Sequence, residues 1–233
     1  MHLLSRFFPG PTFQGPLPVP VARHREVATK PPKNLTVDEA KYVVFDTELT
    51  GLDFSHDSIL SIGAVKMAGA RLFPAGTFYR LTRPGTALKN EGVVVHEITH
   101  DDLAAAEDLS LVLPDFLEFI GEAILVGHFV HIDTHFVSRE MKRIFGISLR
   151  SPSVDTASLH DWLRDNDRDF HRHYGGVSPK TDLFSLAKTY GIENTTAHHA
   201  LSDAFVTAQL FQRFLPFLKK SGIRTARELI AVK

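Results

Sequence analysis

Two carboxylates stand side by side at the end of an apolar run. The apolar residues 43–45 precede Asp46 and Glu48, and only Thr47 separates the two acids. Side chains two positions apart on a strand point to the same face, so each carboxylate raises the cost of ionising the other. A bound cation would neutralise the pair; backbone amides and a nearby arginine are the structural alternative.

Two further aspartates lie in apolar, helical contexts. Asp133 occurs in HIDTHF and Asp203 in HHALSDAFVTAQLF, where an unpaired charge would be costly. Carboxylates gathered in a chain without cysteine favour hard cations such as Mg²⁺ or Mn²⁺ over structural zinc. Two such ions ~3.5–4 Å apart can stabilise the attacking and the leaving oxygen of an in-line displacement at phosphorus. The acids therefore predict two-metal chemistry, provided that the fold brings them together.

The elements that must position these acids follow from the hydrophobic pattern. Asp46 ends the first strand, Asp133 follows a short apolar strand ending near Gly127, and Asp155 ends a third candidate strand. Antiparallel strands followed by alternating helices and strands predict an α/β fold whose mixed sheet has helices on both faces. Sites in such sheets form at strand ends. We expect strands over 42–48, 58–67, 71–82 and 123–128, helices over 114–120, 133–145, 183–190 and 200–215, helix starts at Thr99 and Thr225, and a loop over 165–181.

Composition sets limits on the class of protein. The chain has 233 residues, is 43% hydrophobic and 23% charged, and carries a net charge of −1, so no global basic field indicates nucleic acid. The absence of cysteine excludes disulfides and thiolate chemistry, and a cytoplasmic location is expected. No apolar run approaches the ~18–20 residues of a membrane span, so no membrane partner is expected.

Three segments are expected along the chain. Residues 1–38 form an N-terminal arm, since seven of the 13 prolines fall in the first 34 residues and suppress regular helix and sheet. The arm is either flexible or surface-hugging, or it docks or contacts nucleic acid. Residues 39–216 form the main domain, and 217–233 a helical tail.

Three motifs together carry a resemblance. FDTELTGLD, LVGHFVHID and AHHALSDA resemble the exonuclease motifs of the DEDD family, in its DnaQ-like branch with a histidine, over roughly residues 41–215. This branch includes the proofreading subunit of bacterial DNA polymerase III and several RNA-trimming enzymes. The resemblance implies a ribonuclease H-like fold with a mixed five-stranded sheet, two divalent ions (Mg²⁺ or Mn²⁺), and hydrolysis from a 3′ end that releases 5′-nucleotides.

The resemblance also implies a role for each acid. Asp46 would bridge both metals, Glu48 and Asp203 would complete the tighter site, and Asp133 would hold the second metal, through water. His198 matches the general base of the family, and Glu48 would be a catalytic residue as well as a metal ligand. The remaining candidates are substrate contacts: Thr50, Gly51, Leu52, His96 and Ile98.

The two adjacent histidines present opposite arguments. Helical geometry alone favours His199, which is four residues from Asp203, whereas His198 is five residues away and about 140° off. His198 can reach the site only from a non-helical segment. The resemblance favours His198 and predicts that the helix begins near Ala200.

Several other polar residues have structural explanations. Asp155 is either a fifth acid or, as we prefer, a helix N-cap. His131 and His135 share a helix face that lies ~200° from Asp133, so we expect surface or packing roles instead of zinc binding. The basic residues Lys219, Lys220, Arg224 and Arg227 form either a solvated face, which we prefer, or a nucleic-acid contact.

Two positions depart from the pattern of the family. Phe129 stands where Asn is common, and Ile132 where Phe is common. The loss of Asn affects how the scissile phosphate or terminal sugar is held, and so affects substrate preference. It leaves the metal ligands unchanged.

The expected function is 3′→5′ exonuclease activity on single-stranded ends, with DNA favoured. One rival is an RNA- or oligonucleotide-trimming enzyme with the same chemistry, because separating the two requires sensing of the 2′-hydroxyl. The other rival is a non-catalytic nucleic-acid-binding or polymerase-associated module, which predicts loss of a ligand or the base. None is missing. A nucleic acid with a single-stranded 3′ end is the expected partner, with a DNA polymerase subunit as a second.

Overall fold

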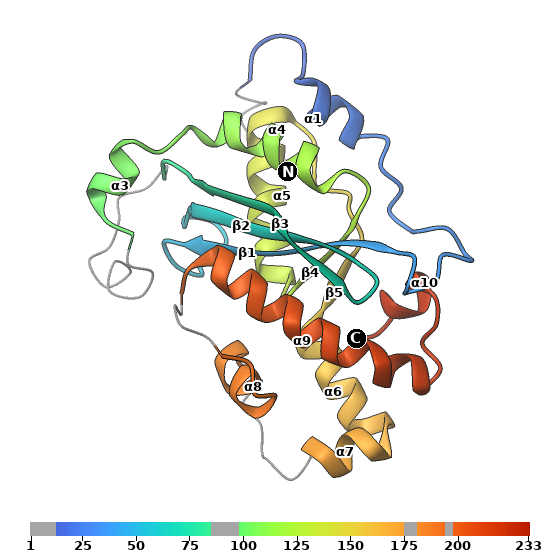
Figure 1. Ribbon diagram of the computed structural model, residues 1–233. Helices are drawn as coiled ribbons and strands as arrows, with labels where there is room; N and C mark the ends of the chain where they lie inside the picture. Colours follow the sequence, from blue (N-terminus) through green and yellow to red (C-terminus); the bar gives the residue numbers. More distant parts are fainter. Residues whose placement is uncertain (1–12, 85–97, 175–180, 194–197) are drawn as a thin grey trace, which may run out of the picture.

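The fold is built on one mixed sheet of five strands in the order β3-β2-β1-β4-β5 (Figure 1). The computed structural model describes residues 13–84, 98–174, 181–193 and 198–233. β1 pairs antiparallel with β2, and β2 with β3, whereas β4 is parallel to both β1 and β5. This is the predicted α/β architecture. The strands are β1 (Lys41–Leu49), β2 (Ile59–Ala68), β3 (Arg71–Leu81), β4 (Ile124–Gly127) and β5 (Ser153–Asp155).

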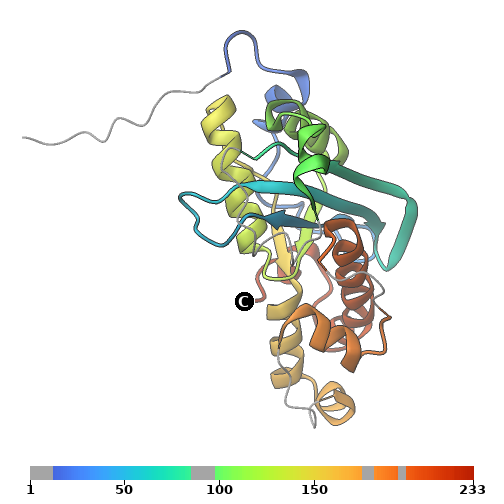
Figure 2. The same cartoon turned by 90° about the vertical axis from the view of Figure 1, so that its left-hand side faces the viewer.

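Helices cover both faces of the sheet, as Figure 2 shows in side view, with α5 on one side and α9 on the other. The side-chain alternation of β1 explains the two layers. Tyr42 and Val44 pack with α9, while Val43 and Phe45 pack with α4 and α5. The helices are α1 (Val19–His24), α3 (His100–Ala104), α4 (Leu109–Ile120), α5 (His131–Phe145), α6 (Thr156–Asn166), α7 (Arg168–Tyr174), α8 (Leu183–Thr189), α9 (Ala200–Lys220) and α10 (Ala226–Leu229).

The helix boundaries that were predicted from capping residues are confirmed. Thr99 and Asp102 form a capping box at α3, and Thr225 forms a second one at α10. Gly146 ends α5 with a φ of 74°, a left-handed conformation that glycine adopts without cost. Local side-chain chemistry thus determined these boundaries.

Three expectations about regular structure were wrong. Residues 19–24 of the proline-rich arm form α1, because prolines in a first turn lose no helical hydrogen bond, and Val21 is buried against α4. The expected loop over 165–181 contains α7, where Asp167 accepts from the backbone N–H of Phe170 and the Phe170 ring is buried. The long helix α9 continues beyond Leu215 to Lys220.

The C-terminal segment packs onto the same core as the sheet. Ala226 and Leu229 are buried in the layer that contains α9. Backbone bonds join this segment to residues 35–37, because Ala226 donates to Leu35 at 2.8 Å and Val37 donates to the Arg224 carbonyl at 2.9 Å. Within the described segments, no helix is both long and apolar enough to cross a bilayer.

Candidate active site

Three of the predicted metal ligands meet at the end of β1. Asp46 and Glu48 continue the even-numbered series of that strand, so they point to the face covered by α9. Asp203 lies in the first turn of α9, and ligand oxygens of the three side chains lie within 4.8 Å of one another. The strand end and the helix start therefore build one carboxylate cluster, which supports the sequence hypothesis.

A glycine of β2 allows α9 to come this close. Gly63 is the antiparallel partner of Asp46. A Cβ at Gly63 would stand 2.1 Å from the backbone nitrogen of Leu201 and 2.3 Å from the carbonyl carbon of Ala200. The start of α9 thus rests directly on the sheet backbone beside Asp46. Gly63 is not among the predicted site residues, although a glycine inside a strand pattern signals close backbone approach.

Asp133 reaches the same strand end from the opposite layer. It lies in the first turn of α5 and is buried. Its Oδ1 accepts from the backbone N–H of Thr47 at 2.9 Å and from the Thr47 hydroxyl at 2.6 Å. Thr47 offers that N–H because β4 pairs with β1 only as far as Val44. Thr47 is a second residue that the sequence analysis did not identify.

The electrostatics of the four acids favour cation binding. Burial is the largest cause that raises the pKa of Asp46 well above its ordinary value, followed by the charges of the other three acids. Burial and then the charges of Asp203 and Asp133 raise the pKa of Glu48 to about 7. Burial also raises the pKa of Asp133 to about 7, although the Thr47 hydrogen bonds favour the ionised form. An all-oxygen set of partly buried carboxylates fits a hard divalent cation.

The two histidines differ in what their rings contact. His199 is the N-cap of α9, where its Nδ1 accepts from the Ser202 N–H at 3.4 Å, and its ring stacks on Tyr79 at 4.6 Å. His198 precedes the helix in a left-handed conformation with a φ of 60°, and its ring meets the Phe184 ring edge-on at 5.0 Å. Its backbone N–H donates to Asp203 Oδ2 at 3.2 Å. The predicted start of the helix at Ala200 is confirmed.

The predicted substrate contacts occupy different environments. Thr50 is buried, Gly51 lies beside it, and Leu52 is 68% exposed, so the turn after β1 presents an apolar side chain to solvent. Ile98 is buried in a small hydrophobic cluster. His96 lies outside the described residues, and its contact stays a prediction.

Phe129 stands where Asn is common in the DEDD family, and its backbone is left-handed with a φ of 53°. Asn tolerates this conformation better than Phe. The Phe129 N–H donates to Asp155 Oδ1 at 2.9 Å, and the Phe129 ring meets the ring of His128 edge-on at 4.6 Å. The same Asp155 carboxylate caps α6, so the preferred capping role of Asp155 is confirmed.

The other polar residues have structural contacts. His131 and His135 are exposed, and the ring of His135 lies 4.4 Å from that of Phe54, as the surface or packing interpretation expected. Lys219 and Lys220 pair with aspartates, and Arg227 donates to a backbone carbonyl. The choice between a solvated face and a nucleic-acid contact for this basic run stays a prediction.

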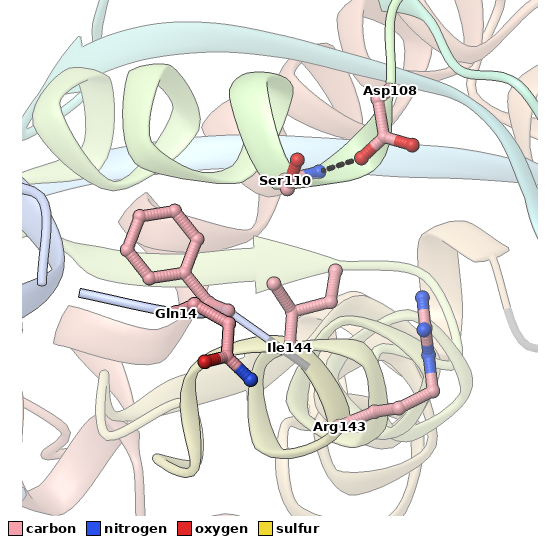
Figure 3. A pocket seen from close by; sticks show the side chains of 6 residues that line it. Gln14, Asp108, Ser110, Arg143 and Ile144 are labelled. Atoms are coloured by element: carbon pink, nitrogen blue, oxygen red, sulfur yellow. Dashed lines mark hydrogen bonds between the residues drawn. The ribbon is translucent and has the colours of Figure 1, made fainter. Parts of the chain in front are cut away.

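A pocket of about 380 Å³ lies apart from the carboxylate cluster, between the N-terminal arm, the start of α4 and the end of α5 (Figure 3). Asp108 caps α4 at its rim by accepting from the Ser110 N–H at 2.8 Å. Arg143 on the α5 side pairs with Glu140 at 2.7 Å. The two charged side chains of this pocket, Asp108 and Arg143, are thus engaged in structural contacts.

The sheet order, the helices on both faces and the acids at the end of the central strand define a ribonuclease H-like fold with a candidate metal centre. Residues 43–211 match the sequence profile of the exonuclease family RNase_T. The chain is 32% identical over 198 residues to DNA polymerase III PolC-type of Thermotoga maritima, and 32% identical over 199 residues to the corresponding protein of Staphylococcus aureus. These matches cover 85% of this chain but only 14% and 13% of the two relatives. The chain therefore belongs to the exonuclease family.

Solved structures show the same fold. Exonuclease I of E. coli in complex with a dT13 oligonucleotide matches with a TM-score of 0.64 and 15% identity, covering 78% of this chain and 42% of that one. Exonuclease X in complex with 5′ overhanging duplex DNA matches with a TM-score of 0.57 and 20% identity, covering 82% and 97%. The predicted ribonuclease H-like fold is confirmed.

Proposed function

We propose that this protein removes nucleotides from the 3′ ends of single-stranded DNA by two-metal hydrolysis and releases 5′-nucleotides. The observation that carries the proposal is the carboxylate cluster of Asp46, Glu48 and Asp203, whose ligand oxygens lie within 4.8 Å of one another at a strand end. Asp133 adds a fourth carboxylate, itself buried, at the same strand end. Membership of the exonuclease family supports phosphodiester hydrolysis. The presence of all four acids argues against a non-catalytic module.

Each acid has a proposed part in holding two divalent cations, Mg²⁺ or Mn²⁺. Asp46 would contribute to holding both ions, Glu48 and Asp203 would help to hold one of them, and Asp133 would help to hold the other. When bound, the ions supply the positive charge that stabilises the negative charge developing on the phosphoryl and leaving oxygens. The raised pKa values of Glu48 and Asp133 reflect the cost that bound cations would remove.

His198 is the proposed general base that takes the proton of the attacking water. An imidazole can accept and release a proton under mild conditions, so histidine suits the role of general base. Its backbone is held by Asp203, which connects the base to the carboxylate cluster. The His199 ring caps α9 and stacks on Tyr79, and the His198 ring meets the Phe184 ring edge-on at 5.0 Å, so the choice of His198 rests on its place in the motif.

DNA is the proposed substrate because the PolC-type relatives are DNA polymerases and the two exonuclease structures hold DNA. The turn after β1, with Thr50, Gly51 and the exposed Leu52, is the proposed seat of the terminal nucleotide. A DNA polymerase is a proposed partner on the same ground. RNA trimming is the alternative outcome of the test below.

The test is digestion of short 5′-labelled DNA and RNA strands of the same sequence with Mn²⁺. The wild type should shorten DNA progressively from the 3′ end, should stop with EDTA, and should spare a strand whose 3′-hydroxyl is blocked. Asp46→Ala should abolish activity, and His198→Ala should lower it ~10²–10⁴-fold. Equal, EDTA-insensitive activity in all three proteins would refute the mechanism. Faster loss of RNA would refute only the substrate preference.

A further inference from the structure

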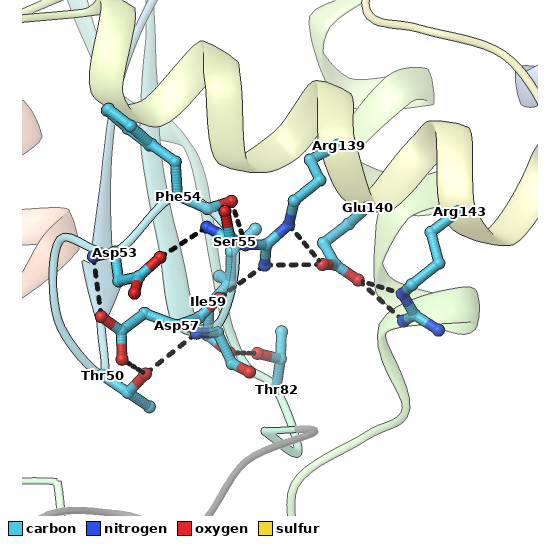
Figure 4. Close-up of polar contacts among 11 residues, drawn as sticks. Thr50, Asp53, Phe54, Ser55, Asp57, Ile59, Thr82, Arg139, Glu140 and Arg143 are labelled. Carbon is cyan, nitrogen blue, oxygen red and sulfur yellow. Dashed lines mark hydrogen bonds and ion pairs between the residues drawn. The ribbon is translucent and has the colours of Figure 1, made fainter. Parts of the chain in front are cut away.

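The turn that follows β1 is closed by one buried aspartate. Asp57 is 5% exposed. Its Oδ1 accepts from the Thr50 hydroxyl at 2.8 Å, and its Oδ2 accepts from the Asp53 N–H at 2.8 Å (Figure 4). The Thr50 hydroxyl in turn accepts from the Ser58 N–H at 2.9 Å. Both carboxylate oxygens thus fix the chain between residues 50 and 53.

Gly51 lies directly against this carboxylate. A Cβ at Gly51 would stand 2.4 Å from Asp57 Oδ2 and 2.9 Å from Asp57 Cγ. The carboxylate has two hydrogen-bond donors and is buried, so it cannot easily swing away. The turn therefore depends on a glycine and an aspartate that fit one another.

Arg139 ties the segment that follows this turn, residues 54–57, to α5. Its guanidinium donates to the Phe54 carbonyl at 2.7 Å and to the Asp57 carbonyl at 2.5 Å. Glu140 accepts from Arg139 at 2.7 Å and from Arg143 at 2.8 Å, which holds the guanidinium in place (Figure 4). α5 is also the helix that carries Asp133, so one helix holds both this segment and a metal-ligand candidate.

We propose that Asp57 is a positioning residue that shapes the 50–53 turn for the 3′-terminal nucleotide, and that Arg139 anchors the adjoining 54–57 segment, which carries Asp57, to α5. The inference rests on the proposed function. Its physical reason is preorganisation, since a turn that is already ordered loses less conformational entropy when the nucleotide binds. Leu52, 68% exposed, is the side chain that this turn presents.

The first test is Asp57→Asn, measured on two substrates. The asparagine oxygen can still accept from Thr50, but the amide cannot accept from the Asp53 N–H. The KM for a single-stranded DNA oligonucleotide should rise about tenfold, equivalent to ~1.4 kcal/mol of binding, while kcat stays near the wild-type value. Hydrolysis of bis(p-nitrophenyl) phosphate, which has no nucleoside, should be unchanged because it depends on the metal centre alone.

The matched control is Asp108→Asn, which makes the same chemical change at the cap of α4. It should leave both KM values unchanged. If Asp57→Asn lowered diester hydrolysis as much as DNA hydrolysis, Asp57 would have only a general structural role and the inference would be wrong. An unchanged KM for DNA would also overturn it.

A mutant cycle keeps the inference testable if Asp57→Asn folds poorly. Gly51→Ala should raise the KM for DNA in the wild-type background, because its Cβ meets the carboxylate. In an Asp57→Ala background the same change should cost little, because the clashing group is gone. Additive effects would contradict the fit between Gly51 and Asp57.

The two proposals fail separately. A wild-type protein inactive on both DNA and the diester would refute the proposed function. A wild-type protein active on both, with Asp57→Asn indistinguishable from it, would refute only the positioning role.

Discussion

Replacing Gly63 with alanine is expected to move the start of α9 and to separate Asp203 from Asp46. The added Cβ would lie 2.1 Å from the Leu201 nitrogen and 2.3 Å from the Ala200 carbonyl carbon. Ordinary contacts begin near 3.4 Å, so the helix must retreat by roughly 1 Å in a close-packed interior. The neighbours are helix backbone, so no side-chain rotation can relieve the contact.

The magnitude follows from that displacement. Misplacing a reacting group by ~1 Å can cost ~100-fold in rate, which is the loss of kcat that we expect for Gly63→Ala. Overpacking costs about 1–3 kcal/mol of folding stability, so the protein should remain folded at room temperature but melt earlier. Mn²⁺ affinity should fall as well, because Asp203 and Asp46 are proposed to share an ion.

The assay is kcat on a single-stranded oligonucleotide together with Mn²⁺ titration, and Gly76→Ala is the control. A Cβ at Gly76 would meet the Lys66 Cβ and the Phe73 carbonyl oxygen at 3.3 Å, so only small adjustments are needed. This control should keep nearly wild-type activity. If Gly63→Ala kept wild-type kcat and Mn²⁺ affinity, the close approach of α9 would not position Asp203, and the reasoning would be refuted.

Three further predictions concern the acids and the base. Between about pH 4.5 and 7 the folded, metal-free protein holds a proton that the unfolded chain has released, because folding raises the pKa of Glu48 from 4.5 to about 7. Its stability should therefore fall as pH rises from 5 to 8, and Mg²⁺ should raise the melting temperature more at pH 8 than at pH 6. Calorimetry of the wild type and of Glu48→Gln tests this, because the stability of the variant should depend less on pH. His198→Ala should lose activity. His199→Ala should keep its metal affinity but melt earlier, because α9 loses its N-cap. If His199→Ala were inactive and His198→Ala active, the assignment of the base would be overturned. Thr47→Val should weaken metal binding ~10-fold or more by releasing Asp133, whereas Thr47→Ser should not, and equal affinities would contradict the anchoring role.

The metal-ligand candidates were predictable because their signal is local. Asp46 and Glu48 follow a buried apolar run, and their shared direction follows from strand alternation. Asp203 follows the helix start by a few residues, and α9 begins at Ala200 as expected. The directions of these side chains follow from the periodicity of the strand and the helix, so they can be predicted from the sequence pattern.

The supporting residues were missed because their roles depend on long-range contacts. Gly63 matters through the start of α9, which is more than 130 residues away along the chain. Thr47 matters through Asp133, 86 positions away. Asp57 is near the turn that it closes, but its burial depends on the packing of α5 over that turn. A sequence pattern shows none of these contacts directly.

The incorrect helix expectations have a related cause. A proline-rich composition predicts an absence of helix, but Pro18 and Pro20 stand at the cap and in the first turn of α1, where proline is tolerated. The polar segment at α7 becomes helical because Phe170 is buried among aromatic rings. Tertiary burial outweighs weak local preference there.

The most direct test of the central claim is the number of divalent ions bound at the four acids. Mn²⁺ binding should be measured by equilibrium dialysis with a nucleoside 5′-monophosphate present, for the wild type and Asp46→Asn. The account predicts two ions per wild-type chain and fewer than one in the variant, because Asp46 is the proposed shared ligand. Unchanged binding in Asp46→Asn, or no binding in the wild type, would contradict it.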